Sequence, residues 1–397
     1  MFIRDMKFNR KKLANGLTIL FEKRDVPVTT VMLAVRYGSG YEPEKEKGTA
    51  HFIEHLCFKG TEKRSAEEIS REIEKVGGIL NAFTGEEETA YHVKLPSQHL
   101  ELAMDVIFDI FFNPIFPEAE VAKESNVICE EIRMYNDNPA NHSLVKIKEL
   151  LYEKPFGIFA AGLEDDIKKM NRSELLKKHN DIYIPENAIL CVVGDNDFDD
   201  VVRMAEKFCI DRKGRAEKFP EIKIMNKEEK EIRKEMQQAH IVLGFHFPLE
   251  RYSGEVFSAI LGRGMSSKLF TEVREKRGLA YSVKSDLDFG ENYAYMIIYA
   301  GTSKNKIREV KEICIEEFKK MEKISEKELE EAKKQVIGNY NVEKEDSSSA
   351  ALNLILDEIQ GNAEEYYKYE DKINSVTLDD IKKLAKRTKF ASFILSP

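Results

Sequence analysis

Two histidines and a glutamate fall within five consecutive residues, in the segment HFIEH that begins at position 51. In a helix, residues at i, i+3 and i+4 share one face, so His51, Glu54 and His55 would project together. Two neutral imidazoles at this spacing can bind one zinc ion, and a neighbouring glutamate can take a proton from the water that a catalytic zinc carries. The alternative is a solvated helix face. The apolar neighbours Phe52 and Leu56 argue against it, because they indicate that the helix is packed. The pattern therefore predicts a metal site with hydrolytic chemistry.

A catalytic zinc needs a third protein ligand, and a second predicted helix over residues 117–135 is rich in candidates. Its glutamates are Glu118, Glu120, Glu124, Glu130 and Glu131. Glu124 and Glu131 are seven residues apart, so two helical turns return them to one face, whereas Glu130 points away from it. Either glutamate alone is more typical of a charged helix surface. Together with the histidines, one of the pair is expected to bind the metal and the other to support the site from behind.

The surrounding elements alternate between strands and helices. The expected order is two strands in 17–40, a helix over 46–58, a helix from Ser65 to Gly77, a hairpin around Gly85 and a buried strand over 188–195. Residues 210–230 are charged and show no sustained apolar period, which is typical of a linker. After the linker a similar order of strand, helix and hairpin begins again, which suggests an internal duplication. The second half contains no HxxEH segment.

Length and composition limit the possible classes of protein. The chain has 397 residues, which favours two domains, and we expect them over 1–218 and 228–397. With 62 Lys and Arg against 71 Asp and Glu, the formal net charge is −9, so nucleic acid is an unfavourable partner. No apolar run is long enough to span a membrane, and the first 20 residues lack the apolar core of a signal peptide. The five cysteines are widely spaced, without a CxxC, which predicts free thiols and a cytoplasmic protein.

Several segments together resemble the insulinase and pitrilysin family of zinc metallopeptidases, the inverzincins. HxxEH is the reverse of the common HExxH motif. The segments that carry the resemblance are LANGLTIL, KGTAHFIEHLCFKGT, GGILNAFTGEEETAYH, VICEEIRMY, YIPENAILCVVGD and MSSKLFTEVREKRGLAYSV. They are most similar to the short two-domain branch that includes the catalytic subunit of the mitochondrial processing peptidase and its prokaryotic relatives. The resemblance implies an α+β fold of two similar α/β domains, each a mostly antiparallel sheet packed with helices, in a LuxS/metallohydrolase-like duplication.

The resemblance also implies roles around the metal. His51 and His55 would be ligands of one Zn²⁺ per chain, and Glu131 would be the third ligand. Glu54 would be the general base, and Glu124 would support the site electrostatically. The interval from His55 to Glu131 holds 131 − 55 − 1 = 75 residues, which fits the family.

Further implied roles concern the substrate. Asn81, Ala82 and Phe83 would bind the substrate backbone by strand addition. Arg274 and Tyr281 match an arginine and a tyrosine that engage the substrate and stabilise the tetrahedral intermediate. Without the resemblance, an exposed helix arginine and a packed tyrosine would be the simpler interpretation. The segment 154–162 departs from the family pattern, so a pocket wall or loop formed by this segment is expected to differ from that of the relatives.

The expected function is a zinc-dependent endopeptidase for peptides and unfolded segments, working as a homodimer without nucleic acid or membrane partners. One alternative is a noncatalytic scaffold or assembly subunit of the same fold. Another is a noncatalytic module that uses zinc only for stability. The zinc content and the cleavage of peptides distinguish the three.

Overall fold

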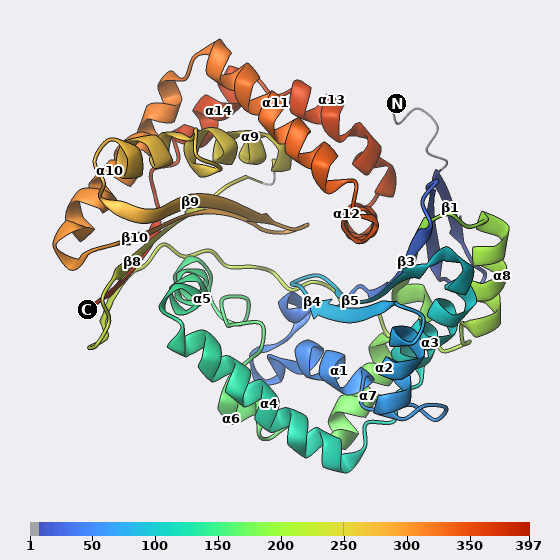
Figure 1. Cartoon of the computed structure of the whole chain (residues 1–397). Helices are drawn as coiled ribbons and strands as arrows, with labels where there is room; N and C mark the ends of the chain where they lie inside the picture. The colour runs from blue at the N-terminus through green and yellow to red at the C-terminus, as the bar shows by residue number, and fades with distance from the viewer. Residues whose placement is uncertain (1–7, 249) are drawn as a thin grey trace. The chain divides into compact units, whose positions relative to one another are not determined.

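The strand β3 (Val28–Val35) is buried from Thr29 to Val35, so both of its faces need cover. Two helices supply it: α3 (Leu100–Phe112), whose sequence is almost wholly apolar, and α12 (Ser347–Ile359). Because α12 comes from the far end of the sequence, the fold of the first half depends on a helix of the second (Figure 1). This computed structural model describes residues 8–248 and 250–397. The opening residues used to judge a signal peptide therefore lie partly outside the described chain.

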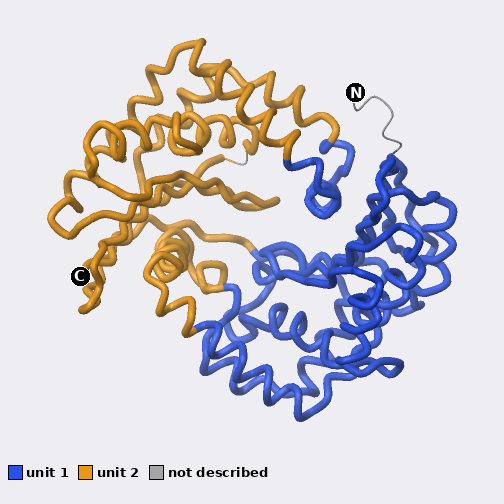
Figure 2. The backbone as a smooth tube through the Cα atoms, viewed as in Figure 1, with its two compact units in different colours: residues 1–132, 160–220, 343–366 blue, residues 133–159, 221–342, 367–397 orange. Residues whose placement is uncertain are grey.

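The chain forms two units that each combine several segments (Figure 2). Unit 1 consists of residues 1–132, 160–220 and 343–366, and unit 2 consists of residues 133–159, 221–342 and 367–397. Most of each unit falls within the ranges expected, 1–218 and 228–397. The differences lie in two exchanged segments, because α5 (Pro139–Leu151) packs on the sheet of unit 2 and α12 packs on the sheet of unit 1.

Unit 1 contains a mixed, mainly antiparallel sheet in the order β1-β2-β6-β3-β5-β4. Its remaining strands are β1 (Phe8–Lys12), β2 (Thr18–Lys23), β4 (Ile79–Thr84), β5 (Thr89–Pro96) and β6 (Ala188–Gly194). The β2–β6 pair is parallel, and the other pairs are antiparallel. The hairpin expected around Gly85 joins β4 to β5, and it leaves β4 at the edge of the sheet.

The sheet of unit 2 repeats this arrangement in the order β7-β11-β8-β10-β9. Its strands are β7 (Glu228–Ile232), β8 (Ala239–His246), β9 (Ala280–Phe289), β10 (Ala294–Thr302) and β11 (Ala391–Ser396). Here β7 and β11 form the parallel pair. If β1 is set aside, the sheet of each unit runs through its own strands in the order first, last, second, fourth, third. The expected repetition of the two halves and the fold class are therefore confirmed.

The helices complete each unit. Unit 1 also contains α1 (Thr49–Cys57), α2 (Ala66–Glu74), α6 (Glu164–Ile167), α7 (Arg172–Ile182) and α8 (Phe198–Phe208). Unit 2 also contains α9 (Arg251–Gly262), α10 (Ile307–Lys320), α13 (Tyr369–Asn374) and α14 (Leu378–Ala385). The long helices α4 (Glu118–Asp137) and α11 (Glu326–Glu343) each run across a unit boundary. Within the described ranges, no helix is both long and apolar enough to cross a membrane.

The two exchanged helices, α5 and α12, occupy equivalent positions in the two units. α5 packs on β8 and β11, and α12 packs on β3 and β6, which hold the same places in their sheets. Gly244 in β8 shows how close the approach is, since an added Cβ would lie 2.7 Å from Leu151 Cδ1. A side chain at this position would push α5 away from the sheet.

Candidate metal centre

The helix α1 brings His51 and His55 onto one partly exposed face. Its opposite side is anchored by Phe52, Ile53 and Leu56, which are fully buried. The two imidazole centroids lie 4.7 Å apart with an interplanar angle of 74°. The side chains of His51 and His55 are 14% and 20% exposed, so both remain within reach of an ion.

Glu131 on α4 completes the group. Its Oε2 lies 3.6 Å from His51 Nε2 and 3.8 Å from His55 Nε2. One ligand atom from each of the three residues lies within 4.8 Å of the others, the one such cluster among the residues that the structure describes. Glu130 is exposed on a different face of α4. The helix phase is therefore the one expected, and the role of the three side chains as ligands stays a prediction.

The protonation of His51 fits a metal ligand. Burial, with a smaller contribution from the neighbouring His55, lowers the pKa of His51 to about 4. A neutral imidazole is the form that binds a metal. Two imidazoles and one carboxylate are a donor set typical of catalytic zinc, which keeps its fourth position for water or substrate. The residues present therefore fit zinc.

Glu124 takes the second position on the same face of α4 but meets a different atom. His55 Nδ1 donates to Glu124 Oε2 at 2.9 Å, and Lys59 Nζ lies 2.8 Å from Glu124 Oε1. Burial raises the pKa of Glu124, but the hydrogen bonds from His55 and Lys59 outweigh it, so this pKa lies below its ordinary value. An ionised Glu124 keeps the proton of His55 on Nδ1, which leaves the Nε2 lone pair on the side of Glu131.

Glu54 lies between the two histidines and is held from the edge strand. Thr84 Oγ1, at the end of β4, donates to Glu54 Oε2 at 2.6 Å. Burial raises the pKa of Glu54, the hydrogen bond from Thr84 and the nearby His55 oppose the rise, and Glu131 adds to it. A carboxylate with a raised pKa accepts a proton more readily than an ordinary one, as a general base requires.

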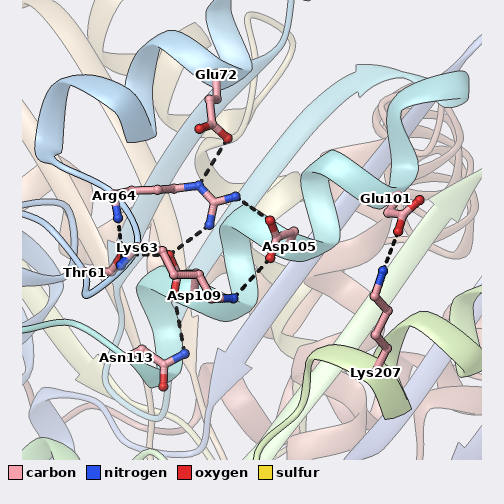
Figure 3. A network of polar contacts seen from close by, with 9 residues as sticks. All are labelled: Thr61, Lys63, Arg64, Glu72, Glu101, Asp105, Asp109, Asn113 and Lys207. Carbon is pink, nitrogen blue, oxygen red and sulfur yellow. Dashed lines mark hydrogen bonds and ion pairs between the residues drawn. The ribbon is translucent and has the colours of Figure 1, made fainter.

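The loop that follows α1 is fastened by a network of charges (Figure 3). The Arg64 guanidinium binds three carboxylates, those of Glu72, Asp105 and Asp109. Asp109 is 2% exposed and also accepts from Thr61 Oγ1 at 2.7 Å. Because these carboxylates belong to α2 and α3, the network fixes the loop that carries Lys59 against both helices.

The proposed substrate residues Asn81, Ala82 and Phe83 lie in the middle of β4. Within the described sheet, β4 pairs with β5 alone, so one edge of its backbone is available for another strand. The position at an edge is as expected, and the binding of a substrate there remains a prediction.

Arg274 and Tyr281 lie together on the surface of unit 2. Arg274 belongs to a short π-helical segment, η5 (Phe270–Glu275), and Tyr281 to the edge strand β9. The Arg274 guanidinium carbon lies 5.5 Å from the centroid of the Tyr281 ring. Tyr281 is 78% exposed, so it is not the packed tyrosine of the simpler interpretation. The proximity shows a common location, and the role in catalysis stays a prediction.

Two residues of the candidate metal centre are not identified from the sequence. Lys59 carried a signal, since it lies four residues after His55 and a helix would place it on the same face. Thr84 carried none, because its contact with Glu54 crosses from a strand to a helix 30 positions earlier. Such a contact depends on how β4 packs on α1.

Comparisons with known proteins found matches along most of the chain. A family model described as insulinase (peptidase family M16) matches residues 18–158, and one described as the peptidase M16 inactive domain matches residues 169–336. A relative in Rickettsia bellii, described as an uncharacterized zinc protease, is 35% identical over 347 residues, which cover 85% of this chain and 84% of the relative. A relative in Bacillus subtilis with the same description is 33% identical over 399 residues, covering 96% and 97% of the two chains.

Solved structures resemble the whole chain. The crystal structure of a protease from Helicobacter pylori has a TM-score of 0.89 and 25% identity, and the match covers 99% of this chain and 100% of that one. A putative M16-like peptidase from Alicyclobacillus acidocaldarius, at 18% identity and a TM-score of 0.86, shares the fold over 100% and 99% of the two chains. On the strength of the family matches and the full-length relatives, this chain belongs to peptidase family M16, the insulinase family of zinc proteases.

Proposed function

We propose that the protein is a zinc-dependent endopeptidase that hydrolyses peptides and unfolded polypeptide segments. The observation that carries the proposal is the convergence of His51, His55 and Glu131 within 4.8 Å, with Glu54 on the same helix between the histidines. A scaffold that had lost its activity would have no need to keep a general base, a metal donor set and the carboxylate behind it in one place.

The residues of this chain divide the chemistry between them. Zinc bound by His51, His55 and Glu131 would supply a Lewis acid that lowers the pKa of water and polarises a carbonyl. Glu54 accepts the proton of the attacking water and later gives it to the leaving amine. Thr84 holds one oxygen of Glu54, which fixes the direction of the carboxylate.

The substrate is expected to bind along β4. An extended peptide can pair with the free edge of this strand through Asn81, Ala82 and Phe83, and main-chain hydrogen bonds then align the scissile bond. A folded protein offers few such extended segments, so peptides and unfolded chains are the preferred class. A homodimer would bring Arg274 and Tyr281 of a second chain to each metal centre, where a cation and a phenol can stabilise the developing oxyanion.

The cysteines support a reducing compartment, and we place the protein in the cytoplasm. Cys57, Cys129, Cys191, Cys209 and Cys314 are all free thiols. Secreted proteins usually pair such residues in disulfides, whereas cytoplasmic ones keep them reduced.

The Glu54→Gln variant tests the proposed function. Glutamine keeps the shape and the hydrogen-bonding capacity of Glu54 but cannot accept the proton. We expect zinc content and peptide binding to be retained and turnover of a mixed peptide library to fall by roughly 10²-fold or more. Zinc content by elemental analysis and cleavage by mass spectrometry give both values on one preparation. A wild-type protein that binds zinc but cleaves no peptide would favour the zinc-stabilised module instead.

A further inference from the structure

The helix that carries the histidines has an unusual N-terminus. Its N-cap residue is Gly48, in the left-handed conformation with φ of +96°, and glycine has no side chain to cap the helix. The cap comes from Glu42 instead. Glu42 Oε2 accepts from Gly48 N at 2.8 Å, and Glu42 Oε1 accepts from Ala50 N at 2.5 Å. One carboxylate thus satisfies two backbone donors at the positive end of α1.

Glu42 caps the helix from a position that is closed to solvent. Its side chain is fully buried, as is that of Lys47, whose ammonium group donates to Ser39 O. Burial raises the pKa of Glu42 to about 8, and the Lys47 ammonium and the backbone hydrogen bonds from Ala50 and Gly48 oppose this rise. The backbone at Gly48 is closely packed as well, because a Cβ on Gly48 would lie 2.6 Å from Ala161 O.

The segment that carries Glu42 is also tied to the turn after the edge strand. Ser39 N donates to Gly85 O at 2.9 Å, and Gly40 N donates to Glu86 O at 2.8 Å. Gly85 directly follows Thr84, the residue that holds the Glu54 carboxylate. Residues 39–42 therefore connect the first turn of α1 with the end of β4.

We propose that Glu42 is a positioning residue of the metal centre: by capping α1 from outside the helix, it fixes the first turn, and with it His51, relative to His55 and Glu131. His51 is the residue directly after Ala50, so any fraying of this turn moves a metal ligand. His55 lies one turn further along, where it is held by Glu124. This role rests on the proposed function, because it presumes that the three side chains bind zinc.

The zinc affinity of Glu42→Gln tests the proposal. An amide has one oxygen, so it can accept only one of the two N–H groups, and its NH₂ faces the other. We expect the zinc dissociation constant to rise by about 10-fold or more, in line with other residues that orient metal ligands. Competition with a chromophoric chelator measures this value. The visible spectrum of the Co²⁺-loaded protein should change as well, since it reports the geometry of the ligands.

Ser65→Ala is the matched control. Ser65 caps α2 through a capping box with Glu68, and α2 carries none of the proposed ligands. This variant loses a helix cap nearby, yet its zinc dissociation constant should stay within about 2-fold of wild type. Zinc affinity falls when a residue that orients a ligand is lost, and Ser65 caps a helix that carries no proposed ligand. Equal zinc affinities in folded Glu42→Gln and wild type, or an equal loss in Ser65→Ala, would overturn the proposal.

A second variant and a separate cleavage assay complete the test of Glu42. If Glu42→Gln does not fold, Glu42→Asp keeps a carboxyl group beside Lys47 but is one methylene too short to reach both amides. It should weaken zinc binding in the same direction, and unchanged affinity would again count against the role. Peptide cleavage is measured separately on the zinc-loaded wild type. Its absence would argue against the endopeptidase and leave the comparison of zinc affinities intact.

Discussion

Glu124 and Glu131 share one face of α4 but serve the two sides of a single imidazole. Glu131 Oε2 approaches Nε2 of His55 at 3.8 Å, while Glu124 Oε2 accepts from Nδ1 at 2.9 Å. The sequence alone predicts that both glutamates face the histidines, because seven residues make two turns. It leaves open which one binds the metal, since that depends on where the axis of α4 lies relative to α1. The resemblance to the family assigns Glu131 as the ligand, and this assignment stays a prediction.

The contact between Thr84 and Glu54 leads to a prediction for a single hydroxyl. Thr84→Val keeps the shape of the side chain and removes the donor to Glu54 Oε2. The carboxylate then loses the partner that fixes its direction, so kcat should fall by roughly 10-fold while KM changes little, as for an interaction that matters mainly in the transition state. Steady-state kinetics on a fluorogenic peptide measure both constants.

Thr84→Ser is the control for this prediction, because serine restores a hydroxyl at the same position. Its kcat should lie close to that of wild type. If Thr84→Val retains full kcat, or if serine fails to rescue it, the hydrogen bond has no part in orienting the base.

At the scale of elements, the boundaries of the strands and helices near the site follow from local sequence. The capping box of Ser65 and Glu68 begins α2 as expected, and the β4–β5 hairpin turns at Gly85. The destination of α5 and α12 does not follow from local sequence. The spacing of apolar residues shows which face of a helix is buried, but it does not show which of two similar sheets buries it.

The start of α12 shows what holds an exchanged helix in place. Asp346 is its N-cap and accepts from Ser348 N at 2.8 Å and Ser349 N at 2.9 Å, while Lys94 on β5 binds its other oxygen. Glu358 near the end of α12 pairs with Arg10 on β1. Charged residues of the unit 1 sheet thus bind both ends of the helix that the far end of the sequence contributes.

Asp346→Ala should lower the free energy of unfolding by about 1 kcal/mol at neutral pH, the usual effect of losing a helix cap. Burial raises the pKa of Asp346, but Lys94 and the two amides lower it more, to about 2. The ordinary pKa of an aspartate is 3.8, so the contribution of the carboxylate is fully present above about pH 4 and is lost as the pH falls towards 2. Urea unfolding at pH 7 and at pH 3 should therefore show a smaller difference between the two proteins at the lower pH.

Asp346→Asn separates the cap from the ion pair, since asparagine caps a helix as well as aspartate does. Asp346→Asn should keep most of the free energy of unfolding at neutral pH. It should lose the part of the pH dependence that comes from the ionisation of Asp346. A difference between wild type and Asp346→Ala that stays constant from pH 7 to pH 3 would show that the charge of Asp346 is not involved.

At the scale of the whole molecule, a duplicated fold carries an unequal distribution of chemistry. Both sheets have the same strand order, and each receives one helix from the other half of the sequence. The candidate metal ligands lie in unit 1, while Arg274 and Tyr281 lie in unit 2. The order of the elements could be predicted from sequence because each half repeats it. The chemistry of each half could be predicted only from residues that occur in one half alone, such as the HxxEH segment of the first.

This unequal distribution makes complementation between two inactive variants the test of the proposed homodimer. If each metal centre receives Arg274 and Tyr281 from the partner chain, Glu54→Gln and Tyr281→Phe damage different members of one composite site. A mixed dimer then holds one centre with both defects and one with neither, as the two-fold symmetry of such dimers requires. We expect each variant to be nearly inactive alone and the isolated mixed dimer to recover about half of the wild-type turnover, since one of its two sites is intact. Differently tagged chains, purified through both tags, provide that species. If the doubly tagged dimer shows no recovery, each chain supplies its own tyrosine, and if no dimer can be isolated, the proposed assembly is wrong.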